Sequence, residues 1–172
     1  MGLLMNMKIP KKEDFYDQNN KLYVMEVEYG LKKYLGKDEK GIIKSFQQYS
    51  AYAFLDDLKY MGGKAFCYYV RPLIKYLIQE SNNWNEHFYD EDKKYIDDDA
   101  PLAYTAIPVI LNFRLSWYSK EYKACFVEII DFLEWVIEHH DNFYPECFHE
   151  SDIKSHYEHI LLRMSKIIHQ EK

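Results

Sequence analysis

The sequence predicts an all-α protein of six to seven antiparallel helices, arranged as a bundle or as a short HEAT-like array of helical hairpins. Apolar residues recur at helical spacing through nearly the whole chain. Gly and Pro number only 6 and 5, which is too few for a strongly punctuated all-β fold. The chain has 172 residues, of which 48% are hydrophobic. That is enough for a substantial core, and we expect residues 1–172 to form a single helical domain.

The first two helices are expected before the Gly62-Gly63 pair. One covers about residues 21–35 and stops at Gly36, although the alternation within residues 23–29 leaves a β-strand as the alternative. The next covers residues 38–61, with Asp38 as its N-cap and the glycine pair as its stop.

The next two helices each contain a proline. The sequence predicts a helix over residues 64–80 that either bends at Pro72 or starts late. A further helix is expected over residues 100–118, with Asp99 as its N-cap and Pro108 in its interior.

Two more helices complete the chain. One is expected from the cap Ser119 to about His140, followed by a loop over residues 141–150. Ser151 is the expected cap of the last helix. Its apolar stripe consists of Ile153, Tyr157, Ile160, Leu161, Met164, Ile167 and Ile168.

Tyrosine is unusually frequent, with 17 residues against 10 Phe and 3 Trp. A tyrosine has a large apolar body and one polar tip, so it suits positions at the edge of a core. We expect most of these tyrosines to pack in the core in place of leucine. A broad contact surface is the alternative.

The three cysteines, Cys67, Cys125 and Cys147, are widely spaced and form neither a CxxC pair nor a zinc pattern. We expect free, mostly buried thiols in a reducing compartment, and therefore a cytoplasmic protein. The N-terminal apolar run is too short for a signal peptide or a membrane span, so no membrane partner is expected.

The acidic residues are concentrated in residues 80–99, which hold 8 of the 28 in the chain and only two lysines. The net charge of this stretch is −6, equal to that of the whole protein. Aromatic residues lie among the carboxylates, which is typical of a contact surface for a basic partner. The expected contact residues are Trp84, Glu86, Tyr89, Asp90, Glu91, Asp92, Tyr95, Asp97, Asp98 and Asp99.

The best enzyme-like pattern is the His140–Asp141 pair, because an adjacent His-Asp pair is the core of the metal-dependent HD phosphohydrolases. His87 would be the upstream ligand and Asp152 the downstream ligand, but the residues that follow the pair do not continue a helix. We favour a role for His139 and His140 at the negative end of a helix dipole.

Other metal patterns are weaker. His156 and His159 share a helix face and could bind a metal together with His149, but a partly buried His159 is the favoured interpretation. Asp90 and Asp92 match only the start of a calcium-binding loop, which the later positions exclude. Phosphate-loop and nucleophile motifs are missing and the lysines form no basic stripe. We therefore expect no enzyme, no cofactor, no metal and no nucleic-acid partner.

Two segments, residues 53–78 and 113–136, resemble a loose class of small acidic all-helical bacterial proteins of largely unknown function. Some members of that class look like immunity proteins that neutralise a partner toxin. The resemblance implies an all-helical fold and carries no catalytic residue. The matching positions are Ala65, Phe66, Tyr69, Pro72, Arg114, Leu115, Phe132, Leu133, Glu134 and Trp135.

The leading hypothesis is a cytoplasmic immunity or antitoxin-like protein that binds a basic toxin domain through the acidic aromatic stretch. The carboxylates would steer the encounter, and the aromatic side chains would anchor the complex. A solvated acidic loop without a partner is the plain alternative. A metal-dependent HD-type phosphohydrolase and a helical-repeat scaffold that binds other proteins are the alternative functions.

Overall fold

The computed structural model describes residues 7–81, 99–116, 120–139 and 150–169. These residues form helices joined by short connections and contain no β-strand, which confirms the all-α prediction. In chain order the elements are η1 (Lys12–Phe15), α1 (Val24–Tyr34), α2 (Glu39–Tyr49), α3 (Ala51–Tyr60), α4 (Gly63–Ser81), α6 (Asp99–Ser116), η2 (Lys120–Cys125), α7 (Phe126–Glu138) and α8 (Glu150–His169).

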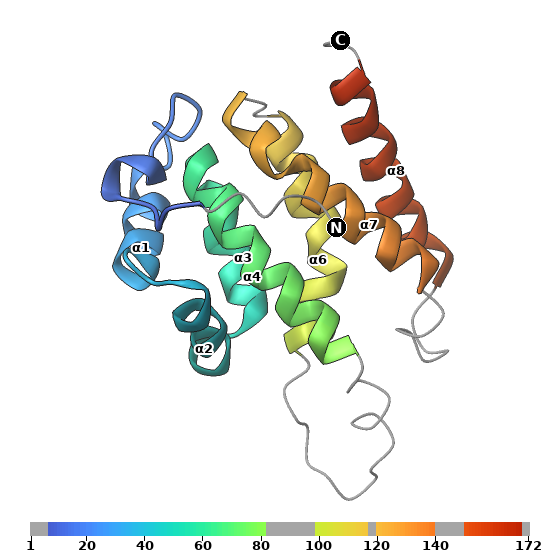
Figure 1. Ribbon diagram of the computed structural model, residues 1–172, viewed down its shortest axis with the longest axis horizontal. Coiled ribbons are helices and arrows are strands. Elements are labelled where there is room, and N and C mark those ends of the chain that lie inside the picture. The colour runs from blue at the N-terminus through green and yellow to red at the C-terminus, as the bar shows by residue number, and fades with distance from the viewer. Residues whose placement is uncertain (1–6, 82–98, 117–119, 140–149, 170–172) are drawn as a thin grey trace, which may run out of the picture.

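The helices follow one another across the molecule in successive layers, from α1 and α2 to α8 (Figure 1). Helix α3 packs between α1 and α6, while α4 packs against α2, η1 and η2. Helix α8 lies at the far side, against α6 and α7. The most extensive of these contacts, between α3 and α6, joins helices that are not consecutive in the chain, so in the described residues alternate helices stack on one another, as in a short helical array.

The predicted helix over residues 38–61 is wrong, because the chain breaks at Ser50 into α2 and α3. Ser50 has a φ of 74°, in the left-handed region, and its N–H donates to the carbonyl of Phe46 at 3.1 Å. Its hydroxyl accepts from the N–H of Ala53 at 3.0 Å and so caps α3. Neither a glycine nor a proline marks this break, so the apolar period runs through it undisturbed.

The other boundaries differ less from the predictions. The first helix is α1 rather than a strand, and α4 continues through Pro72 although a proline has no N–H to donate. Asp99 is the first residue of α6 instead of its cap, and α8 begins one residue before Ser151. The predicted helix from Ser119 to His140 starts with the 3₁₀ segment η2 before α7 begins.

Buried tyrosines link successive layers, so the predicted place in the core holds for some of the described tyrosines, while Tyr29 and Tyr52 are exposed. Tyr69 of α4 donates its hydroxyl to the carbonyl of Tyr34 in α1 at 2.6 Å. Tyr34 in turn donates to Asp57 of α3 at 2.8 Å. On the other side, Tyr157 of α8 donates to the carbonyl of Tyr104 in α6 at 2.7 Å. Tyr34, Tyr69 and Tyr157 are 0% exposed, and the hydroxyl of each donates to a partner inside the core.

The raised pKa values of three tyrosines predict a loss of stability at alkaline pH. Burial raises the pKa of Tyr69 and, less strongly, that of Tyr68. Burial and then the hydrogen bond to Glu28 raise the pKa of Tyr16 to about 12. Because the unfolded chain ionises first, the stabilisation is complete below pH of about 10 and is lost as the pH rises through the folded-state pKa values.

We expect urea midpoints to be level from pH 8 to 9.5 and to fall steadily from pH 10 to 11.5. Part of the tyrosinate absorbance at 295 nm, that of the buried rings, should appear only together with unfolding. Tyr69→Phe should make the fall shallower, because one of the raised groups is removed. A midpoint that rises with pH over this range would contradict the assignment.

The prediction of free thiols is wrong for Cys67 and Cys125, which form a disulfide. The predicted burial is confirmed, since both residues are 0% exposed. The two cysteines are 58 residues apart and meet only because η2 packs on α4. Cys147 lies outside the described residues. In the described part of the chain, no helix is both long and apolar enough to cross a bilayer.

Candidate functional site

The predicted contact stretch falls almost wholly outside the described residues. Trp84, Glu86, Tyr89, Asp90, Glu91, Asp92, Tyr95, Asp97 and Asp98 are not described, and neither is His87. Asp99 is the first residue of α6. The assignment of these residues as contact residues stays a prediction.

The two helices that carry this stretch are firmly packed. Leu77 near the end of α4 is 1% exposed, and Ala103 near the start of α6 is 0% exposed. At the end of α4 the Ser81 hydroxyl donates to the carbonyl of Ile78 at 2.6 Å. The stretch is therefore held at both ends by helices that belong to the core.

An acidic surface lies on α7. Asp131, Glu134 and Glu138 are exposed and share one helix face with Val127, which is 57% exposed. The neighbouring carboxylate of Glu128 is instead paired with Arg71 of α4. The exposed face adds negative charge to the C-terminal half of the molecule, in the part of the chain that the structure describes.

The His-Asp pattern is described only at its start. His139 is the C-cap residue of α7, with its ring Nδ1 2.8 Å from the carbonyl of Trp135 and its ring stacked on the Trp135 ring. This contact supports the predicted role of His139 at a helix end. His140 and Asp141 lie outside the described residues, and the phosphohydrolase alternative stays a hypothesis.

The histidines of α8 are exposed. His156 and His159 both face solvent, so the predicted partial burial of His159 is wrong. His159 lies beside the apolar stripe, but α6 and α7 cover the stripe from the other side. Among the described residues, no three His, Cys, Asp or Glu side chains come close enough to hold a metal ion.

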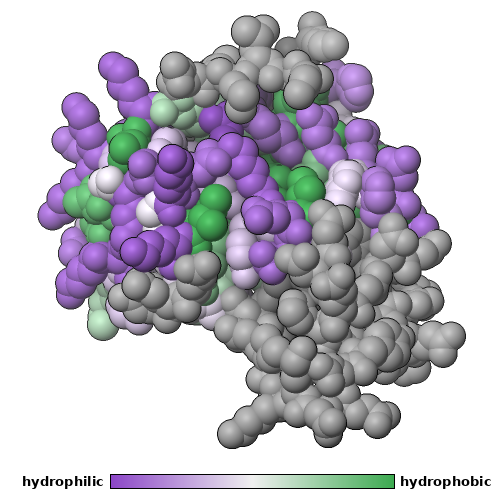
Figure 2. Space-filling view, turned by 60° about the horizontal axis from the view of Figure 1, so that its bottom comes forward, coloured by the Kyte–Doolittle hydropathy of each residue, from purple (hydrophilic) through white to green (hydrophobic). Residues whose placement is uncertain are grey.

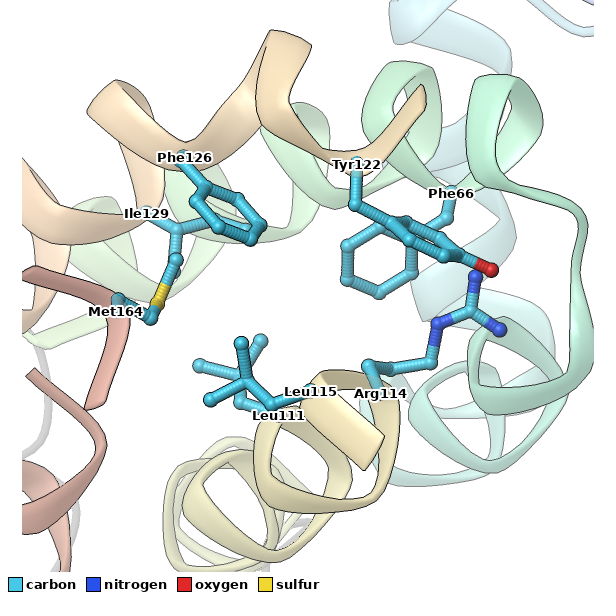
Figure 3. Close-up of a pocket in the computed structure, with 8 residues that line it drawn as sticks. All are labelled: Phe66, Leu111, Arg114, Leu115, Tyr122, Phe126, Ile129 and Met164. Carbon is cyan, nitrogen blue, oxygen red and sulfur yellow. The ribbon is translucent and has the colours of Figure 1, made fainter. Parts of the chain in front are cut away.

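A buried arginine, Arg114 near the end of α6, is the least expected polar group of the structure. It is 3% exposed, and its Nη1 donates to the carbonyl of Lys59 at 2.7 Å. Its guanidinium lies 4.3 Å from the ring centroid of Tyr122 and 4.6 Å from that of Phe66 (Figure 3). Both aromatic faces stabilise the cation in place of water.

Asp17 connects this arginine site to the N-terminal segment. Its Oδ2 accepts from the Tyr122 hydroxyl at 2.8 Å and from the N–H of Gly63 at 3.2 Å. Its Oδ1 accepts from the N–H groups of Asn19 and Asn20 at 2.7 and 3.1 Å. One carboxylate thus ties together the loop after η1, the start of α4 and η2.

Asn20 extends the network to α3. It is 1% exposed, and its Nδ2 donates to the carbonyls of Phe15 and Tyr60 at 2.8 and 2.9 Å. The carbonyl of Tyr60 thereby receives a donor, and the carbonyl of Phe15 receives a second one beside the N–H of Gly62.

This network is built to hold the fold. Burial lowers the pKa of Arg114 to about 10, with Tyr122 and Asp17 acting in the opposite direction, so the side chain is still a cation at neutral pH. The cavity beside it has a volume of about 10 Å³, enough for about one water molecule and too small for a substrate. No sequence pattern predicts the network, because Asp17 and Arg114 are far apart in the chain.

An apolar strip lies on the outer side of α1. Met25 and Tyr29 lie four residues apart on α1 and are 84% and 56% exposed, and Leu22, in the turn before the helix, is 89% exposed. The Nζ of Lys33 lies 3.9 Å from the Tyr29 ring centroid. Figure 2 shows hydrophobic side chains between hydrophilic ones on the side of the molecule where α1 and α2 lie. Such a strip is a candidate contact surface.

Comparisons of the chain with protein-family models, with curated proteins and with solved structures find no match. The resemblance to small acidic helical bacterial proteins stays a prediction from the residues of its two segments.

Proposed function

We propose that this protein is a bacterial immunity or antitoxin-like protein that binds and neutralises a basic toxin domain. The observation that carries the proposal is the concentration of charge in residues 80–99, whose net charge of −6 equals that of the whole chain. Trp84, Tyr89 and Tyr95 lie among the carboxylates and would supply apolar contact area.

The charge distribution along the chain supports this proposal. Residues 1–81 carry 13 Lys and Arg against 10 Asp and Glu, whereas residues 82–172 carry 9 against 18. The exposed carboxylates of α7 belong to the acidic half. A partner with a positive surface, such as a nuclease toxin that grips phosphates, would be steered toward this half of the molecule.

The firm packing of α4 and α6 suits an inhibitor. A contact segment held at both ends loses less conformational freedom on binding than a free tail does. The carboxylates would speed the encounter, and the aromatic side chains would slow dissociation.

The test uses the product of a toxin-like reading frame next to the gene as the partner. Changing Asp90, Glu91 and Asp92 together to Lys should slow association about tenfold or more at low salt, and much less at high salt, where charges are screened within a few ångströms. Trp84→Ala should instead speed dissociation, because an anchor is lost. Surface plasmon resonance at two salt concentrations separates the two effects.

The matched control reverses an equal number of negative charges on another helix. Changing Asp131, Glu134 and Glu138 of α7 to Lys alters the net charge equally but leaves residues 80–99 intact. We expect a smaller change in the association rate from this variant. If the Asp90 to Asp92 variant and Trp84→Ala both bind like the unchanged protein, residues 80–99 are a solvated loop. The apolar strip on α1 would then be the next surface to examine.

A further inference from the structure

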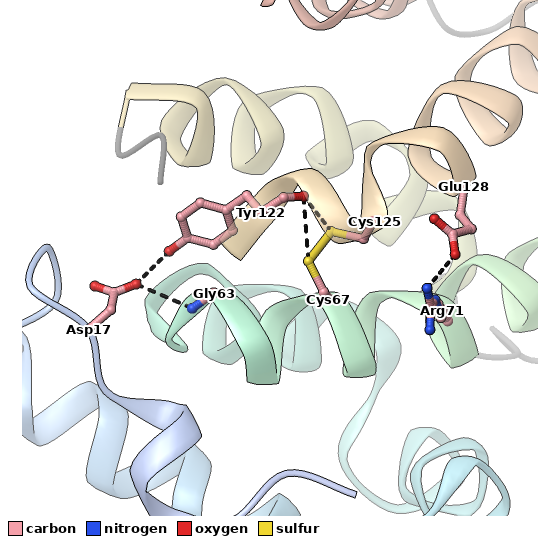
Figure 4. Close-up of a disulfide and its surroundings, with 7 residues drawn as sticks. All are labelled: Asp17, Gly63, Cys67, Arg71, Tyr122, Cys125 and Glu128. Carbon is pink, nitrogen blue, oxygen red and sulfur yellow. Dashed lines mark hydrogen bonds and ion pairs between the residues drawn. A yellow bond between two sulfur atoms is a disulfide. The ribbon is translucent and has the colours of Figure 1, made fainter. Parts of the chain in front are cut away.

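The disulfide joins α4 to η2, two segments that pack against each other. Cys67 lies in the second turn of α4, and Cys125 is the last residue of η2 (Figure 4). Their Cα atoms are 5.1 Å apart, within the usual range for a disulfide. The bond therefore fixes the start of α7 on α4.

The surroundings of the two sulfurs suit both redox states. The carbonyl of Tyr122 lies 3.5 Å from Sγ of Cys67 and 3.2 Å from Sγ of Cys125. A disulfide sulfur carries no hydrogen, so in the oxidised protein these are only close contacts. After reduction each thiol would find this carbonyl as an acceptor, so reduction leaves no buried thiol far from an acceptor.

Other contacts would keep the reduced protein folded. Arg71 of α4 pairs with Glu128 of α7, and the hydroxyl of Tyr122 reaches Asp17 (Figure 4). The Tyr122 ring also packs edge-on against Phe66 at 5.7 Å between centroids. The disulfide thus adds to an interface that exists without it, and its main effect is to restrict the unfolded chain.

We infer that Cys67 and Cys125 form a buried redox lock, and that the protein works in an oxidising compartment such as the bacterial periplasm. The two thiols pass two electrons and two protons to the disulfide of a thiol–disulfide oxidoreductase, so the Sγ–Sγ bond forms here while the S–S bond of that partner breaks to give two thiols. Such bonds persist outside the reducing cytosol. The cytoplasmic prediction was based on three free thiols, and the disulfide removes that basis. This inference does not depend on the acidic stretch.

Burial of the two cysteines should make reduction of the disulfide slow. Thiol–disulfide exchange needs a thiolate to reach one sulfur along the bond, and both residues are 0% exposed. The disulfide should therefore be reduced only after η2 has separated from α4. We expect dithiothreitol to reduce the native protein at least about tenfold more slowly than the urea-unfolded protein.

The first measurement counts thiols. In the organism that makes the protein, cells are quenched in acid and the denatured protein is alkylated. We expect one label, on Cys147, and three labels after reduction. Peptide mapping should then find the Cys67–Cys125 pair. Three labelled thiols without reduction would contradict the inference that the protein works in an oxidising compartment. A disulfide that includes Cys147 would contradict the pairing of Cys67 with Cys125.

The second measurement concerns stability. The double variant Cys67→Ser, Cys125→Ser should keep its helical circular dichroism at 20 °C but unfold roughly 5–15 °C lower than the oxidised protein. Cys147→Ser should unfold at the same temperature as the unchanged protein. Reduction should lower the unfolding temperature of both proteins by the same amount. Equal unfolding temperatures for the oxidised protein and the double variant would show that the bond does not lock the two layers together.

Discussion

Gly62→Ala is expected to destabilise the protein by about 3 kcal/mol. A Cβ atom at this position would lie 2.7 Å from the carbonyl oxygen of Asp14 and 2.9 Å from backbone atoms of Phe15 and Tyr16. The N–H of Gly62 also donates to the carbonyl of Phe15 at 2.8 Å. Because the obstructing atoms are backbone, no side chain can turn aside, and η1 must move away from the turn between α3 and α4.

The matched control is Gly30→Ala in the interior of α1. A Cβ there would meet only the Cε atom of Met61, at 3.6 Å, which is ordinary contact. Since alanine favours a helix over glycine, this variant should gain about 0.5–1 kcal/mol. Urea unfolding of both variants gives the comparison. If Gly62→Ala is as stable as the unchanged protein, the close approach of η1 to this turn is wrong.

Much of the fold could be predicted from the sequence because it follows from local patterns. Apolar spacing located the helices of the N-terminal and C-terminal ends to within a few residues, and Asp38 was correctly identified as a cap, since it accepts from the N–H of Gly41 at 2.8 Å. The break at Ser50 could not be predicted. A left-handed serine there leaves the apolar period intact, and only tertiary packing favours two helices over one.

The polar interior could not be predicted for a different reason. The partners of Asp17 lie in the loop after η1, in α4 and in η2, and no local pattern records which of them will meet. The same holds for Cys67 and Cys125, whose separation resembles no motif. Apolar spacing and capping patterns concern residues within one turn of a helix of each other. The contacts of Asp17 and of the two cysteines depend instead on how the layers stack.

Arg114→Ala is the second variant with a large expected effect, a loss of about 3 kcal/mol. The substitution removes the side chain that lies against the rings of Tyr122 and Phe66 and leaves a cavity between α6 and η2. It also removes the donor that the carbonyl of Lys59 uses at 2.7 Å. For a domain of this size such a loss lowers the unfolding temperature by roughly 6–12 °C, measured by calorimetry.

Arg114→Met separates packing from charge. Methionine fills most of the same space without a cation, so the rings of Tyr122 and Phe66 keep their contact while the hydrogen bond to Lys59 is lost. Removing a desolvated charge offsets part of that loss, and we expect a cost of about 1 kcal/mol. If the Met variant is as unstable as the Ala variant, the cation itself holds η2 in place through Tyr122 and Asp17. If neither variant loses stability, the buried arginine does not support this junction. Its burial would then have to be explained by something other than the contact between α6 and η2.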